Sequence, residues 1–246
     1  MKKIAFLGAK KIGLECLKVL ERHSASYDFE IVGVLTNSRG ENIKHYANSK
    51  RLNLLGSLSD YLALSDIDIT ISVQFDKILK VEHINKAKEV SINLHMAPLP
   101  EFRGCNQFSH AILQNRSIFG TTIHIIDEGI DSGPILFEER FDIPADVWVE
   151  DLYNLTFQKS IELFERSLKS IVDLDFTPVP QEKLIADRGS EIHYRNEIEQ
   201  LKCLDLASSE MQLERQIRAT YMPGFSPPFF EIGGVKYSIS KLDKDT

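Results

Sequence analysis

Cysteine is scarce in this chain, and its scarcity limits the chemistry that the sequence can support. The 246 residues contain three cysteines, Cys16, Cys105 and Cys203, which are far apart and odd in number. They show neither the close pairs of a metal-binding motif nor an even set suited to a disulfide framework. We therefore expect no metal and no disulfide, and we predict a cytoplasmic protein because a reducing compartment keeps thiols free.

Long apolar runs and an excess of positive charge are also missing. No segment approaches the roughly 18–20 apolar residues of a membrane span. Lys10 and Lys11 interrupt the first apolar run too early for a signal peptide. The chain has 36 acidic and 29 basic residues, which give a net charge of −7. We accordingly predict no membrane partner and no broad contact with a nucleic-acid backbone.

The glycine-rich patterns that hold nucleotides are absent as well. Gly8 and Gly13 follow the first strand-like segment, but they do not complete the G-x-G-x-x-G pattern of dinucleotide-binding folds. The Gly-Lys-Ser/Thr sequence of a phosphate-binding loop is also missing. We interpret the two glycines as parts of a tight turn from a strand into a helix, without direct contact to a ligand.

What the sequence does contain is a regular alternation of strand and helix patterns. Apolar, β-branched segments predict strands at residues 3–7, 31–35, 68–73, 90–94, 121–126 and 137–143. Helical patterns cover residues 8–20, 82–88, 106–113 and 149–174. Such alternation predicts an α/β fold with a doubly wound, mostly parallel sheet, in which the last strand lies at an edge. Ligands of these sheets bind beyond the carboxyl ends of the strands.

A proline-rich break separates the last quarter of the chain from the rest. The sequence Thr-Pro-Val-Pro at residues 177–180 cannot continue the helix before it. We therefore predict a larger domain over residues 1–176 and a small C-terminal α+β module over residues 177–246. The predicted elements of the module are a strand at 192–194, a helix at 210–220 and a hairpin at 229–237.

The most informative segment lies at the end of the fourth predicted strand. Asn93 and His95 are two residues apart, so their side chains point to the same face of that strand. A proline-rich turn follows, and a later segment, residues 127–133, places Asp131 in a glycine-bracketed loop. An amide, an imidazole and a carboxylate can stabilise an oxyanion, accept a proton and orient the imidazole. These are the requirements of acyl transfer to an amine.

Each of these features also has a purely structural interpretation. Asn93 and His95 could form a hydrogen-bonded polar pair at the end of a strand. His124 has apolar neighbours within a predicted strand, and we expect it to be a hydrogen-bonded core histidine. Asn106 could cap the helix that follows it, or the same helix N-terminus could face an anionic phosphate. The C-terminal aromatic residues could belong to a core.

Taken together, the two segments resemble a known family. Asn-Leu-His, a proline-rich turn with Arg103 and Gly104, and then Asp-Glu-Gly-Ile-Asp-Ser-Gly are similar to the folate-dependent formyltransferases, most of all those that formylate sugar nucleotides. The resemblance implies a Rossmann-like formyltransferase fold, N10-formyltetrahydrofolate as co-substrate and a catalytic domain over residues 1–176. Met96 and Ala97 depart from the family pattern, because many members have Pro-Ser after the histidine.

The resemblance also implies roles for individual residues. The family's catalytic asparagine, histidine and aspartate carry over onto Asn93, His95 and Asp131. The residues implied to bind the folate are Ser72, Gln74, Phe75, Asp127 and Gly129. The residues implied to bind the acceptor substrate are Arg103, Gly104, Asn106, Gln107, Tyr221 and Phe225.

The implied function is transfer of a formyl group to the amine of a nucleotide-linked amino-deoxy sugar. We expect a dTDP- or GDP-linked 4-amino-4,6-dideoxyhexose, used for a surface polysaccharide such as the O-antigen of lipopolysaccharide, and a homodimeric enzyme. Methionyl-tRNA formyltransferase is an alternative, but it usually has a larger, basic C-terminal domain. Glycinamide ribonucleotide transformylase normally lacks the Pro-Gly-aromatic C-terminal module. A binding module without turnover would not need three intact catalytic residues.

Overall fold

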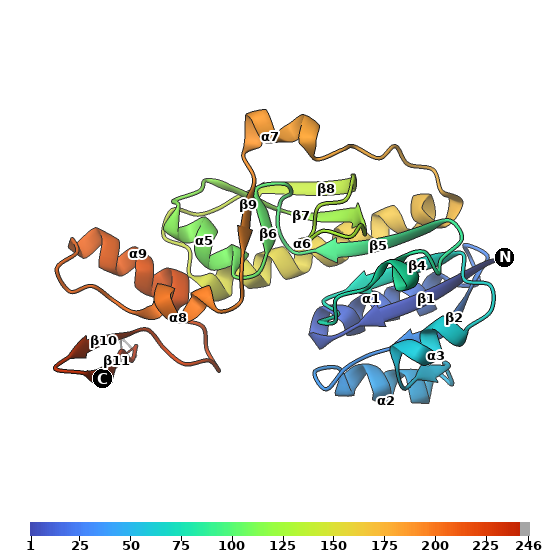
Figure 1. Cartoon of the computed structure of the whole chain (residues 1–246), viewed down its shortest axis with the longest axis horizontal. Helices are drawn as coiled ribbons and strands as arrows, with labels where there is room; N and C mark the ends of the chain where they lie inside the picture. The colour runs from blue at the N-terminus through green and yellow to red at the C-terminus, as the bar shows by residue number, and fades with distance from the viewer. Residues whose placement is uncertain (242–246) are drawn as a thin grey trace.

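A seven-stranded sheet forms the centre of the computed structural model, which describes residues 1–241 (Figure 1). The strand order is β3-β2-β1-β4-β5-β7-β8. The first five strands run parallel, whereas β7 is antiparallel to both β5 and β8. These strands are β1 (Lys2–Gly8), β2 (Phe29–Leu35), β3 (Leu54–Leu55), β4 (Ile69–Val73), β5 (Val90–His95), β7 (Ile118–Ile125) and β8 (Ile135–Asp142). The predicted mostly parallel sheet with β8 at its edge is confirmed.

Helices cover both faces of this sheet, which makes it doubly wound. Because side chains of a strand alternate between faces, Phe6 of β1 enters the core under α1 (Lys10–His23) and α6 (Val149–Asp173). Leu7 enters the opposite core, under α3 (Leu58–Ala63). The buried residues of α6 recur at helical spacing: Val149, Leu152, Thr156, Ser160, Leu163, Phe164, Ser167, Leu168, Ile171 and Val172.

Several short elements were not predicted. They are α2 (Glu41–Ser49), β3, α3, β6 (Phe102–Gly104), α7 (Glu182–Arg188) and α8 (Glu197–Lys202). The helix predicted over residues 82–88 is shorter, since α4 covers only Val81–Ile84. It ends at Ile84, and the Lys88 N–H then donates to the carbonyl oxygen of Ile67, which aligns the chain to enter β5. No helix within residues 1–241 is both long and apolar enough to cross a membrane.

After the proline-rich break, the chain returns to the sheet before it forms the C-terminal elements. Val179 exchanges two backbone hydrogen bonds with Ile135 of β8, at 2.9 and 2.8 Å. Further along, β9 (Glu191–His193) pairs in parallel with β6. The segment after residue 177 therefore extends the hydrogen bonding of the larger domain. The predicted domain boundary at residues 176–177 stays a prediction.

The C-terminal helix and hairpin form as predicted, and Figure 1 shows them at the end of the molecule remote from β2 and α2. They are α9 (Glu210–Thr220) and the antiparallel strands β10 (Phe229–Ile232) and β11 (Val235–Ser238). Ala219 of α9 is buried in a second core together with Phe102 and Phe119, and it joins the helix to the larger domain. Residues 242–246 of the predicted module lie outside the described residues.

Candidate active site

The structure brings Asn93, His95 and Asp131 together at the carboxyl end of β5. Asn93 and His95 share one face of β5, and the loop between β7 and β8 carries Asp131 back toward them. The Nδ2 atom of Asn93 lies 3.5 Å from Oδ1 of Asp131. The Nδ1 atom of His95 lies 3.5 Å from Oδ2 of the same carboxylate. An amide, an imidazole and a carboxylate therefore meet where the sequence predicted.

The His95 ring has a defined tautomer. Its Nε2 atom lies 2.8 Å from the carbonyl oxygen of Phe102, and because a carbonyl only accepts hydrogen bonds, Nε2 carries a proton. In the neutral ring, Nδ1 is therefore the nitrogen that can accept a proton, and it faces Asp131. A carboxylate in this position favours the imidazolium that proton transfer would produce.

Asp131 is ionised and lies in an uncommon backbone conformation. Burial by itself would raise the pKa of its carboxyl, but the positive charge that the His95 ring carries when protonated and the N–H of Gly104 hold that pKa well below its usual range. The Gly104 N–H donates to Oδ2 at 3.0 Å. The φ angle of Asp131 is +47°, in the left-handed region that residues other than glycine seldom adopt. Contacts around the loop must hold it there.

His124 is the buried, hydrogen-bonded histidine that the sequence predicted, and it also contacts the site. Two of its partners are the predicted site residues. Its Nδ1 atom donates to the Ile125 carbonyl oxygen at 2.8 Å, so Nε2 is free to accept from Nδ2 of Asn93 at 3.2 Å. The same Nε2 lies 3.5 Å from Oδ1 of Asp131. The antiparallel register places His124 opposite Asn93, and the strand pattern of the sequence does not reveal that pairing.

Arg103 and Gly104 both contact the Asp131 loop. The Nε atom of Arg103 donates to the Ile130 carbonyl oxygen at 2.7 Å. Gly104 has a φ of +86°, and a Cβ at this position would lie 2.3 Å from the carbonyl oxygen of His193. Because the backbones of Gly104 and His193 approach so closely, only glycine fits at residue 104. In this conformation the Gly104 N–H reaches Asp131.

Asn106 and Gln107 lie at the start of α5 (Gln107–Leu113). Asn106 is the N-cap residue of α5, as expected, but its side chain makes no capping hydrogen bond and its φ is +57°. Its Nδ2 atom instead donates to the carbonyl oxygen of Tyr194 at 2.8 Å. Gln107 is buried as the first residue of the helix. Asn106 therefore joins α5 to the segment that follows β9.

The residues implied to bind the folate lie in two places around the triad of Asn93, His95 and Asp131. Ser72 of β4 is opposite Asn93 of β5, so the end of β4 borders the site. Gln74 follows with a φ of +53°, and its Oε1 accepts a hydrogen bond from Nζ of Lys10 at 2.8 Å. Phe75 packs against the core on the α3 side of the sheet. These positions form one border of the site.

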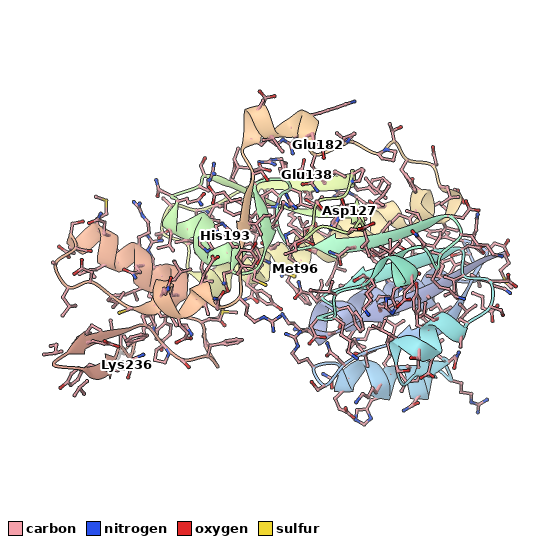
Figure 2. All side chains as sticks on the ribbon, in the orientation of Figure 1. Met96, Asp127, Glu138, Glu182, His193 and Lys236 are labelled. Atoms are coloured by element: carbon pink, nitrogen blue, oxygen red, sulfur yellow. The ribbon has the colours of Figure 1, made fainter. Side chains whose placement is uncertain are left out.

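The second place is the loop that carries Asp131. The Oδ1 atom of Asp127 accepts hydrogen bonds from the Gly129 N–H at 3.1 Å and from Oγ of Ser132 at 2.6 Å. Asp127 thus shapes the turn, and Figure 2 shows it near the end of β7. Met96, labelled in the same view, is buried in the main core, and Ala97 is buried in the second core. The two residues that depart from the family pattern therefore serve packing.

The two C-terminal aromatic residues have different surroundings. Tyr221 ends α9 and packs edge-on against Trp148, with ring centroids 6.2 Å apart. Phe225 is 69% exposed. The aromatic contact of Tyr221 is thus with Trp148 rather than with the triad.

Sequence reasoning missed a group of cations near the ends of β1 and β2. Lys10 is exposed as a residue, but partial desolvation of its ammonium group lowers its pKa, and the guanidinium groups of Arg39 and Arg195 lower it further. Arg39 also pairs with Asp76 at 2.9 Å. Arg195 follows β9, so the group combines residues that follow β1 and β2 with the segment after residue 177. Neighbouring cations of this kind favour an anionic ligand.

With this geometry in place, comparison with known proteins identifies the family. The model of the formyl transferase family matches residues 2–168, which is more than half of the chain. The chain therefore belongs to the formyl transferase family. The fold and the site are in accord with that assignment.

Two curated relatives and one solved structure illustrate the likeness. GDP-perosamine N-formyltransferase of Brucella melitensis is 29% identical over 178 residues, which cover 72% of this chain and 66% of the relative. Methionyl-tRNA formyltransferase of Clostridium perfringens is 31% identical over 114 residues, covering 46% of this chain and 37% of the relative. The N-formyltransferase from Helicobacter canadensis in complex with folinic acid and dTDP-3-aminofucose has a TM-score of 0.79 and 24% identity, over 96% of this chain and 86% of that one.

Proposed function

We propose that this protein transfers a formyl group from N10-formyltetrahydrofolate to the amine of a nucleotide-linked amino sugar. The observation that carries the proposal is the meeting of Asn93, His95 and Asp131 at the end of β5 in a member of the formyl transferase family. The similarity to a GDP-perosamine N-formyltransferase supports a sugar nucleotide as the acceptor. The chain spans 66% of that relative's length.

In the proposed reaction, the acceptor amine attacks the formyl carbon and a negative charge develops on the formyl oxygen. The Nδ2 group of Asn93 has two N–H donors, and its contact with Asp131 is long at 3.5 Å. One N–H can therefore turn toward the oxyanion while the other stays on His124. A single oxyanion donor of this kind lowers the barrier by about 3–4 kcal/mol.

The proton of the attacking amine moves to Nδ1 of His95. The new C–N bond forms, the bond between the formyl carbon and N10 of the folate breaks, and the imidazolium returns the proton to N10. Asp131 stabilises the imidazolium from 3.5 Å, and the Phe102 carbonyl keeps the ring oriented. Each of these residues thus has a separate part in the step.

We assign the diphosphate of the acceptor to the cations Lys10, Arg39 and Arg195. The protein is acidic overall, yet these three side chains are close enough to depress the pKa of Lys10. A diphosphate placed among them would relieve that repulsion. Tyr221 and Phe225 are proposed to cover the base, because stacking on an aromatic ring suits any nucleobase.

The test is an assay of purified protein with N10-formyltetrahydrofolate and two acceptors in competition. We expect dTDP- or GDP-linked amino sugar to gain the mass of one formyl group and charged initiator tRNA to gain none. Methionyl-tRNA formyltransferase activity is the second candidate, because a relative with that name matches part of the chain. Preference for tRNA would overturn the proposed acceptor.

We further propose a cytoplasmic homodimer that acts on a 4-amino-4,6-dideoxyhexose used for the O-antigen of lipopolysaccharide. The hairpin β10–β11 supports the dimer, since Ile232 and Val235 on it are 58% and 53% exposed. A two-stranded hairpin is only marginally stable alone. Native mass measurement tests the dimer, and acceptors with the amine at different ring positions test the sugar.

A further inference from the structure

Gln181 is a buried side chain that the proposed reaction does not use. It follows the proline-rich break, precedes α7 and is 3% exposed. Its Nε2 atom donates to the carbonyl oxygen of Asp131 at 2.9 Å and to that of Gly133 at 2.7 Å. Both N–H groups of one amide therefore bind the loop that carries the proposed catalytic carboxylate.

The loop needs a restraint of this kind. Asp131 has a positive φ angle, which a residue other than glycine adopts only when its surroundings enforce it. Gly133 passes so close to β7 that an added Cβ would lie 1.9 Å from the carbonyl oxygen of Ile125. The two hydrogen bonds from Gln181 fall on either side of Ser132, so they fix the path of the backbone just after the carboxylate.

Gln181 is itself firmly anchored. Val179, two residues earlier, exchanges two hydrogen bonds with Ile135, and the Leu184 N–H donates to the Gln181 carbonyl oxygen. The Oε1 atom of Gln181 is buried without a hydrogen-bond partner among the described residues. A buried acceptor without a partner destabilises a protein. Because the unpartnered Oε1 lowers the stability of the protein, we infer that the Gln181 amide is retained for the two hydrogen bonds that it donates to the Asp131 loop.

We propose that Gln181 is a positioning residue, which holds the Asp131 carboxylate against His95 by fixing the backbone of its loop. The inference rests on the proposed function, because it assumes that Asp131 takes part in formyl transfer. It also gives the segment after residue 177 a place in the reaction. The residue contacts neither the substrates nor the reacting atoms in this scheme and acts only through Asp131.

The test is a double-mutant cycle on kcat. Gln181→Met keeps the length of the side chain but removes both donors. We expect kcat to fall roughly ten- to a hundredfold, because a small displacement of a catalytic group has effects of this size, while the KM values of both substrates change little. In an Asp131→Asn background, Gln181→Met should have no further effect, since its action passes through that carboxylate.

Gln216 offers a matched control in the same chain. Its Nε2 atom also donates to two carbonyl oxygens, those of Leu201 at 2.8 Å and Cys203 at 2.9 Å, in the C-terminal elements. Gln216→Met should lower the Tm without changing kcat. If Gln181→Met is insoluble, Gln181→Asn keeps the amide but shortens its reach, and the same loss of kcat is expected from it.

The outcomes separate the two proposals. If Asp131→Asn leaves kcat unchanged, the proposed catalytic role of Asp131 fails. If Asp131→Asn lowers kcat but soluble Gln181 variants turn over like the wild type, the positioning role is overturned. Equal effects of Gln181→Met in both backgrounds would also overturn it, because the residue would then act independently of Asp131.

Discussion

Replacement of Asp131 by asparagine is the most direct perturbation of the proposed centre. The change removes one negative charge and keeps the size of the side chain. The carboxylate faces Nδ1 of His95 at 3.5 Å and is 18% exposed, so solvent screens the pair only in part. In the proposed reaction, this carboxylate stabilises the positive charge that His95 gains from the amine.

The separation of the two groups sets the expected magnitude. A full imidazolium and a carboxylate attract by about 5 kcal/mol at 3.5 Å and an effective dielectric constant of about 20. If about half of the charge has developed in the transition state, the loss is about 2.4 kcal/mol, and kcat falls about 50-fold. Complete charge development would give a fall of about 3000-fold.

The assay follows formylated product by mass spectrometry at saturating concentrations of both substrates. Asp66→Asn is the control, because Asp66 is an exposed carboxylate paired with Lys88 and lies outside the site. The control should turn over like the wild type. A folded Asp131→Asn protein with wild-type kcat would refute the assignment of this carboxylate to the stabilisation of His95.

Four further results are expected. Asn93→Ala should lower kcat roughly 10²–10³-fold in the same assay, as expected of an oxyanion donor; an unchanged kcat would contradict that role. Arg195→Gln should raise the KM of the sugar nucleotide roughly tenfold and leave that of the folate unchanged; equal effects on both would argue against a diphosphate site. Gly104→Ala should lower the Tm more than Gly189→Ala, because both glycines have positive φ but only Gly104 has a carbonyl oxygen 2.3 Å from the added Cβ. Finally, the folded-state pKa of Asp131 is depressed, so its contribution to the free energy of unfolding is complete above about pH 4 and is lost at lower pH. In denaturant titrations, the stability difference between wild type and Asp131→Asn should therefore narrow as the pH falls below about 4.

The sequence predicted those parts of the fold whose side chains follow a clear period. The strands of the sheet and the helix α6 are such elements, because their buried residues repeat every two residues or every three to four. The helix α2 buries only Ile43 and Ala47, and α7 buries none of its residues. Elements that bury so little leave no periodic pattern, so they could not be predicted in this way.

The site was predictable where its residues are close in sequence or belong to a recognisable motif. Asn93 and His95 are two residues apart, and Asp131 belongs to the second motif segment. The role of His124 depends on the direction of β7 relative to β5, which a strand pattern does not reveal. Gln181 is 50 residues from its acceptor Asp131, and only the folded chain shows the contact. The same holds for the cations that join Arg195 to Lys10.

The return of the chain to the sheet after the proline-rich break has a consequence for the order of assembly. A nascent polypeptide ending at residue 176 would already hold Asn93, His95 and Asp131. It would nevertheless lack the bonds from Val179 to β8, the amide of Gln181, the pairing of β9 with β6 and the charge of Arg195. Completion of the site therefore depends on segments that are synthesised after residue 176, and a product truncated there would carry Asn93, His95 and Asp131 without these supports.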